Sequence, residues 1–121
     1  MGDLEEAKRI LRDQNLSLVI VKDGVLLLSL DSRGIDGLLQ AIRRLGGRLS
    51  GASVADKIVG KAAALLLAYS KIARAYASTI SRSGLATLSR YGIPVEYDSL
   101  VPKILDKDRR GVCPFEKLAS N

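Results

Sequence analysis

The chain has 121 residues, 47% of them hydrophobic, and its 19 lysines and arginines outnumber 13 acidic residues to give a net charge of +6. This length predicts one domain over residues 1–121, with an aliphatic core because there are only four tyrosines, one phenylalanine and no tryptophan. The sequence has no long uncharged apolar run and no basic leader, which argues against a membrane or secreted protein, and its one cysteine indicates a reducing cytoplasm.

The beginning of the chain predicts a helix followed by a β-hairpin. Apolar residues recur at helical spacing over residues 4–13, with Asp3 as the expected N-cap. Residues 16–21 form an almost continuous β-branched run, typical of a central strand covered on both faces. The pair Asp23-Gly24 then favours a tight turn into a second strand over residues 25–30.

The middle of the chain predicts two helices. The first covers residues 35–45, is capped by Asp31 or Ser32, and ends at a pair of glycines. The second runs from Val54 to Tyr69 and is apolar on nearly every face in its later part. A helix that is apolar all round is buried, so the rest of the chain is expected to pack around this one.

The last third predicts alternating strands and helices and a tail. The expected elements are a strand over 72–80, a helix over 84–91 capped by Ser81 or Ser83, a strand over 93–97, a turn or helix over 100–105, and a short helix over 112–118. The resulting order, α-β-β-α-α-β-α-β plus a tail, predicts an α/β fold: a three-layer α-β-α sandwich with a mixed sheet opened by a hairpin.

The composition excludes several kinds of catalysis. With no histidine there is no Ser-His-Asp triad and no Cys-His pair. One cysteine and no histidine cannot supply the three nitrogen and sulfur ligands of a zinc deaminase, so no metal or other cofactor is expected. Gly60-Lys61 ends like a phosphate-binding loop, but Ala62 replaces the required hydroxyl residue.

The start of the predicted buried helix is the main candidate site. Gly51 gives a flexible approach, Ser53 can cap the helix, and Asp56 suits the positive end of the helix dipole. Lys57 and Lys61 follow one turn apart on one side. This arrangement favours an anionic small molecule such as a nucleotide, which the basic net charge also suits. An ordinary loop and capping box, on a chain that is basic for solubility, explains the same residues.

Cys113 is the only good nucleophile in the sequence. It precedes Pro114 at a predicted helix start, where the pKa of a thiol falls, and Glu116 or a lysine such as Lys117 could accept its proton. A tail that folds over the helix mouth would make a Cys113-dependent transferase or hydrolase, with Asp56 nearby. The alternative is a small buried hydrophobic residue. Whether the chain is an enzyme therefore stays open.

Nucleic-acid binding has weaker support. Five of the arginines could form a patch that contacts phosphates: Arg43, Arg44, Arg48, Arg109 and Arg110. However, the tyrosines are scattered and form no platform for stacking bases. An RNA-associated or structural subunit, binding through its basic surface or an edge strand near Pro94, is the third hypothesis. Self-association into a homodimer is compatible with a small apolar-rich domain, although no residue specifies it.

Two segments resemble a known family. Residues 51–64, Gly-Ala-Ser-Val-Ala-Asp-Lys-Ile-Val-Gly-Lys-Ala-Ala-Ala, and residues 111–117, Gly-Val-Cys-Pro-Phe-Glu-Lys, resemble signatures of a small prokaryotic family catalogued as domain of unknown function 1893. The resemblance implies a cytidine-deaminase-like fold. True deaminases open the buried helix with a His/Cys-Ala-Glu motif, where this chain has residues 54–57. The Pro-Cys-x-x-Cys ligands would fall at residues 81–84, Ser-Arg-Ser-Gly, so the fold is expected without its zinc chemistry.

The sequence thus predicts a zinc-free deaminase-fold protein that binds a nucleotide or a similar phosphorylated small molecule. The expected ligand-binding residues are Gly51, Ser53, Asp56, Lys57, Lys61 and Lys117. The expected catalytic residues, if the chain is an enzyme, are Cys113, Asp56 and Glu116.

Overall fold

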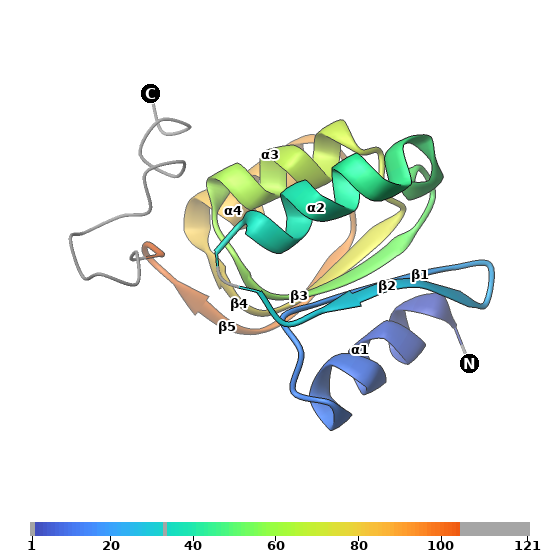
Figure 1. Ribbon diagram of the computed structural model, residues 1–121. Coiled ribbons are helices and arrows are strands. Elements are labelled where there is room, and N and C mark those ends of the chain that lie inside the picture. The colour runs from blue at the N-terminus through green and yellow to red at the C-terminus, as the bar shows by residue number, and fades with distance from the viewer. Residues whose placement is uncertain (1, 33, 105–121) are drawn as a thin grey trace.

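Strand β1 (Leu18–Lys22) is buried on both of its faces, as its β-branched sequence predicts. Leu18 and Ile20 belong to the larger of two core clusters, whereas Val19 and Val21 belong to the smaller one. The computed structural model describes residues 2–32 and 34–104 and has one sheet between two layers of helices (Figure 1). The predicted three-layer α-β-α sandwich is therefore confirmed.

The described residues form a sheet of five strands in the order β2-β1-β3-β4-β5. The other four are β2 (Val25–Leu30), β3 (Ser53–Val59), β4 (Arg74–Ser81) and β5 (Val95–Val101). Strand β1 pairs antiparallel with β2 and β3, while β3, β4 and β5 run parallel. The mixed sheet and the opening hairpin agree with the sequence prediction. The prediction had four strands, and β3 is the one that it missed.

The helices divide unequally between the two faces. Of the helices in the described part of the chain, α1 (Asp3–Asp13) is the one on the first face, and its apolar stripe packs on β1, β3 and β4. The opposite face carries α2 (Asp36–Leu45), the short 3-10 helix η1 (Gly46–Leu49), α3 (Lys61–Tyr69) and α4 (Arg82–Arg90) (Figure 1). Helix α3 is the most apolar of these, which agrees with its burial, although it is shorter than predicted.

The turn of the hairpin holds the beginning of α1 in place. Asp23 and Gly24 both have positive φ angles, 52° and 78°, so the predicted tight turn is confirmed. Their backbone N–H groups donate to the carboxylate of Asp3 at 2.8 and 3.0 Å. Asp3 was expected to be the N-cap of α1. Instead Gly2 is the N-cap and Asp3 is the first helical residue, because its carboxylate bonds the turn.

A polar network joins the other end of α1 to the parallel strands. The hydroxyl of Tyr76, a residue that is 1% exposed, donates to Asp98 at 2.5 Å and lies 3.5 Å from the guanidinium of Arg12. The ammonium of Lys8 lies 2.7 Å from Glu96 and 5.1 Å from the centre of the Tyr76 ring. These contacts tie α1 to β4 and to the edge strand β5.

Several predicted boundaries need correction. Helix α2 has Ile35 as its N-cap, not Asp31 or Ser32, because the backbone N–H of Ser32 donates to Ser17 and the chain makes a further turn. Ser81 caps α4, as one of the two alternatives proposed. The segment expected as a turn or helix from residue 100 begins as the end of β5. The predicted tail helix over 112–118 lies outside the described residues.

Gly84, in the first turn of α4, lets this helix approach the end of β3 closely. A Cβ atom at this position would lie 2.9 Å from the carbonyl oxygen of Val59 and 3.1 Å from that of Gly60. Both neighbours are backbone atoms, which cannot move aside by changing rotamer. A glycine is therefore required where the starts of α3 and α4 meet.

We expect the substitution Gly84→Ala to destabilise the fold by about 1–3 kcal/mol, because the added methyl group overpacks this contact. Alanine favours a helix over glycine by about 1 kcal/mol, so a net loss of stability means that the cost of the steric clash exceeds this gain. Urea unfolding followed by circular dichroism gives the midpoint. The exposed Ser89→Ala on the same helix is the control and should change stability by less than about 0.5 kcal/mol. Equal midpoints for the Gly84 variant and the parent would contradict the role assigned to this contact.

Candidate functional site

The stretch predicted as one buried helix is a strand followed by a helix. Ser53 to Val59 form β3, Gly60 is the N-cap of α3, and the helix begins at Lys61. The predicted helix over 54–69 is therefore wrong in its first half. Ser53 caps no helix, and Asp56 and Lys57 are strand residues. At about 3.3 Å per residue, Ser53 is separated from the end of β3 by roughly 20 Å.

The predicted site is consequently divided between the two ends of β3. Gly51 and Ser53 lie at its amino end, and Lys61 lies just beyond its carboxyl end. Lys57 is exposed, and its backbone N–H donates to the carbonyl oxygen of Ser17 at 2.9 Å. A strand sends alternate side chains to opposite faces, so Lys57 and Asp56 point to different layers.

Two helices begin side by side at the carboxyl ends of β3 and β4. Helix α3 starts at Lys61, directly after β3, and α4 starts at Arg82, directly after β4. The close contact of Gly84 with Val59 and Gly60 joins the two helix starts. Ser81 caps α4 by accepting a hydrogen bond from the backbone N–H of Gly84 at 3.0 Å. Partial positive charge from two helix dipoles is therefore concentrated at this edge of the sheet.

The charged side chains at this edge oppose the helix dipoles. Helices α1 and α2 have acidic residues in their first turns and arginines in their last, the arrangement that stabilises a helix. Helices α3 and α4 have no acidic residue in their first turns and instead begin with Lys61 and Arg82. Two cations thus flank two positive helix ends. Lys61 is among the residues predicted from the sequence and Arg82 is not, although a cation at a first helical position is a signal that the sequence carries.

Asp56 is a partly buried carboxylic acid on β3. Its register partners, Leu18 on β1 and Ala77 on β4, belong to the larger core cluster, so it lies on the face covered by α2, α3 and α4. Burial raises the pKa of Asp56 from 3.8 to about 7, while hydrogen bonds from the backbone N–H groups of Ile58 and Lys57 act in the opposite direction. Asp56 can therefore exchange a proton near neutral pH.

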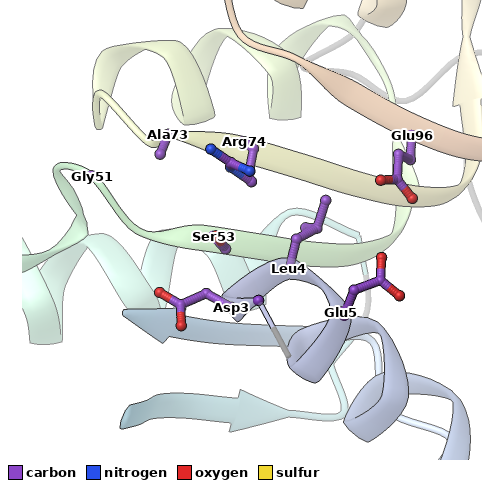
Figure 2. Close-up of a pocket in the computed structure, with 9 residues that line it drawn as sticks. Asp3, Leu4, Glu5, Gly51, Ser53, Ala73, Arg74 and Glu96 are labelled. Atoms are coloured by element: carbon purple, nitrogen blue, oxygen red, sulfur yellow. The ribbon is translucent and has the colours of Figure 1, made fainter. Parts of the chain in front are cut away.

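The amino ends of β3, β4 and β5 line a pocket of about 360 Å³ together with the first turn of α1 (Figure 2). Ser53, Arg74 and Glu96 come from the strands, and Gly51 and Ala73 come from the loops that precede β3 and β4. Residues 2–5 of α1 form the opposite wall. Asp56, Lys57 and Lys61 do not line this pocket. Gly51 and Ser53 are among the residues predicted from the sequence, but none of the charged residues around them is.

The catalytic hypothesis on the tail concerns residues that the structure does not describe. Cys113, Glu116 and Lys117 all lie outside the described residues. Within residues 2–32 and 34–104, no three His, Cys, Asp or Glu side chains come together as a metal-binding group. No helix in the same part of the chain is both long and apolar enough to cross a membrane.

Comparison with known families places this fold. The model of the family described as "TM1506: Domain of unknown function (DUF1893)" matches residues 6–121. The chain belongs to this family. A structure of a DUF1893 family protein from Thermotoga maritima is 34% identical to the chain, with a TM-score of 0.88, and the match covers 98% of this chain and 80% of that one. No curated protein matches the chain.

More distant structures share the fold of this DUF1893 member. RibD from Acinetobacter baumannii is 19% identical with a TM-score of 0.58, and the match covers 97% of this chain but 36% of RibD. The dCMP deaminase of the cyanophage S-TIM5, in a structure in complex with dCMP and dUMP, is 12% identical with a TM-score of 0.52. That match covers 78% of this chain and 92% of the deaminase. The deaminase-like fold predicted from the sequence is thereby confirmed.

The raised pKa of Asp56 predicts a pH dependence of stability. The folded state holds a proton on Asp56 that the unfolded state has released, so stability falls as the pH rises from about 4 through about 7 and is level above that. Between pH 5 and pH 8 we expect a loss on the order of 2 kcal/mol. The chain has no histidine, so no imidazole titrates in this window. Urea unfolding at a series of pH values measures the effect.

The variant Asp56→Asn cannot ionise and serves as the control. Its stability should change much less between pH 5 and pH 8, and it should exceed the parent's stability at pH 8. Parallel pH profiles for the two proteins would show that the Asp56 carboxyl titrates as an ordinary exposed acid.

Proposed function

We propose that the protein binds a nucleotide or a similar phosphorylated small molecule at the carboxyl edge of β3 and β4. The observation that carries this proposal is the pair of adjoining helix starts that have cations where the dipole favours acids, Lys61 on α3 and Arg82 on α4. In α/β sheets, ligands bind outside the carboxyl ends of parallel strands, and helix N-termini there accept phosphate groups.

The energetic reason is that an anion relieves an unfavourable arrangement. A cation in the first turn of a helix loses about 0.3–1 kcal/mol of dipole interaction relative to its favourable place at the other end. A phosphate group between the two helix starts would interact favourably with both dipoles and with both side chains. The backbone is already fixed for such a ligand, because the Gly84 contact holds α4 against the end of β3.

The class of ligand is supported by the distant structural relatives. The cyanophage protein that shares the fold is named a dCMP deaminase and has a structure with dCMP and dUMP, so nucleotides are the first ligands to test. The net charge of +6 favours the approach of any phosphorylated molecule. We assign to Asp56 a hydrogen bond with a ligand hydroxyl or base. It lies on the face of β3 that carries α2, α3 and α4, three residues before the end of the strand. Lys57 points to the face that carries α1, and its role in ligand binding stays a prediction.

We further propose that this site works without zinc. The two helix starts offer the ammonium of Lys61, the guanidinium of Arg82 and the hydroxyls of Ser81 and Ser83, and none of these groups is a usual ligand of zinc. The whole chain has no histidine and one cysteine, which falls short of the nitrogen and sulfur donors of a zinc deaminase. These donors do not fit a zinc ion, and we assign no deamination step to the site.

Isothermal titration with dCMP, dUMP, GMP and inorganic phosphate tests the proposal. We expect at least one nucleotide to bind, and Lys61→Ala and Arg82→Ala each to weaken it by about tenfold, which corresponds to 1.4 kcal/mol. Because each cation opposes a helix dipole, the ligand-free variants should be as stable as the parent or slightly more so. A loss of affinity without a loss of stability is the signature of a binding role.

Arg90→Ala is the matched control, because it removes an exposed arginine from the opposite end of the same helix as Arg82. It should leave nucleotide affinity unchanged. Equal losses of nucleotide affinity in the Arg82 and Arg90 variants would mean that affinity depends on the net charge of the protein and not on a site at Arg82. No heat of binding for any nucleotide at millimolar concentration would count against the proposed function itself.

A further inference from the structure

We propose that the pocket in Figure 2 is a second and separate binding site, for a small zwitterion that carries an ammonium group and a carboxylate several bonds apart. It lies at the amino ends of β3 and β4, whereas the proposed nucleotide site lies at their carboxyl ends. Ser53 and Arg74 are the first residues of β3 and β4, whereas Lys61 and Arg82 follow the last residues of the same strands. Its volume of about 360 Å³ falls within the range of small-molecule sites.

The first observation is the charge of the lining, which is opposite to that of the chain. Three carboxylates, those of Asp3, Glu5 and Glu96, line the pocket with one guanidinium, that of Arg74, although basic residues outnumber acidic ones by 19 to 13 overall. Asp3 is already bonded to the hairpin turn. Glu5 and Glu96 share one ammonium, that of Lys8, at 3.7 and 2.7 Å. Two carboxylates beside one ammonium leave negative charge that a second ammonium would balance.

The second observation is the hydroxyl of Ser53, which has no hydrogen-bond partner among the described residues. Ser53 is 4% exposed and lines the pocket, and within residues 2–32 and 34–104 no hydrogen bond of its hydroxyl is found. No fully buried side-chain oxygen or nitrogen of the described residues is without a partner, so this hydroxyl oxygen is open to the pocket, where water or a ligand can bond it. The open side of Ser53 is the pocket, and a polar atom of a bound molecule would supply the missing partner.

The third observation is the separation of charge along the pocket. Figure 2 shows Glu5 and Glu96 together on one side and Arg74 nearer to Ser53 and Ala73; the carboxylate of Asp3 also lies on the Ser53 side, where it bonds the hairpin turn. Arg74 is exposed and has no acidic partner within the described part of the chain. Arginine binds a carboxylate through two parallel hydrogen bonds. The pocket therefore has a place for an anion near Arg74 and Ser53, and a place for a cation near Glu5 and Glu96.

Three probe molecules of similar length test this assignment with the full chain. 4-Aminobutyrate carries both charges, putrescine carries two ammonium groups, and succinate carries two carboxylates. We expect 4-aminobutyrate to bind about tenfold more tightly than either of the others, measured by titration of backbone amide NMR shifts. The shifts should centre on residues 51–53, 73–74 and 96. Equal binding of putrescine or succinate, absence of any saturable shift at millimolar concentration, or shifts centred on residues 60–62 and 82–84 would overturn the proposal.

Matched variants separate binding from folding. Glu5→Gln and Arg74→Ala should each weaken 4-aminobutyrate by about tenfold, while Glu6→Gln on the same helix turn and Arg90→Ala should not. Ser53→Ala removes a hydroxyl without a protein partner, so the ligand-free variant should melt at the same temperature as the parent or higher, yet bind more weakly. A destabilised Ser53→Ala protein, or control variants that weaken binding equally, would show that these residues have a structural role only. Failure here leaves the nucleotide site untouched, because the two sites share no side chain.

Discussion

The pairing of β3 with strands of opposite direction on its two sides is the constraint on which the rest of the structure depends. On one side it pairs antiparallel with β1, through Leu18 opposite Asp56, and on the other it pairs parallel with β4, through Asp56 opposite Ala77. The parallel strands β3, β4 and β5 therefore all begin at one end of the sheet and all finish at the other. Helix starts collect at the carboxyl edge, and strand starts with their polar side chains collect at the amino edge, beside α1. The two proposed sites follow from this separation.

The sequence predicted most of the fold because most elements have a clear local pattern. Strand β1 has a continuous β-branched run, and its turn has the pair Asp23-Gly24 with positive φ angles. Strand β3 was missed for a physical reason. The first half of β3 is buried on both faces and so loses the alternation of polar and apolar residues, and Ala55 and Lys57 are residues that disfavour strands. Merged with the alanine-rich α3, these residues imitate one long buried helix with a polar start.

The candidate site was only partly predictable, since side chains far apart in the sequence build it. Lys61 was found because it stands before an apolar helix, and this signal survives the shift of the helix start from residue 54 to residue 61. The pocket joins Asp3, Ser53, Arg74 and Glu96, which come from four different elements. No local pattern relates these residues. Only the parallel register of β3, β4 and β5, together with the position of α1 under them, brings them together.

The place of β1 between β2 and β3 also affects how the chain is made. Strand β1 is translated early, yet its second neighbour, β3, is translated only after β2, α2 and η1. During that interval the nascent hairpin exposes one unpaired strand edge, and Leu18 and Ile20 stay uncovered until α2 and the later helices have been made. Unpaired apolar edges are where newly made chains pair wrongly with one another. Late closure of the sheet by β3 leaves this strand edge open to such mispairing until residues 53–59 have been made.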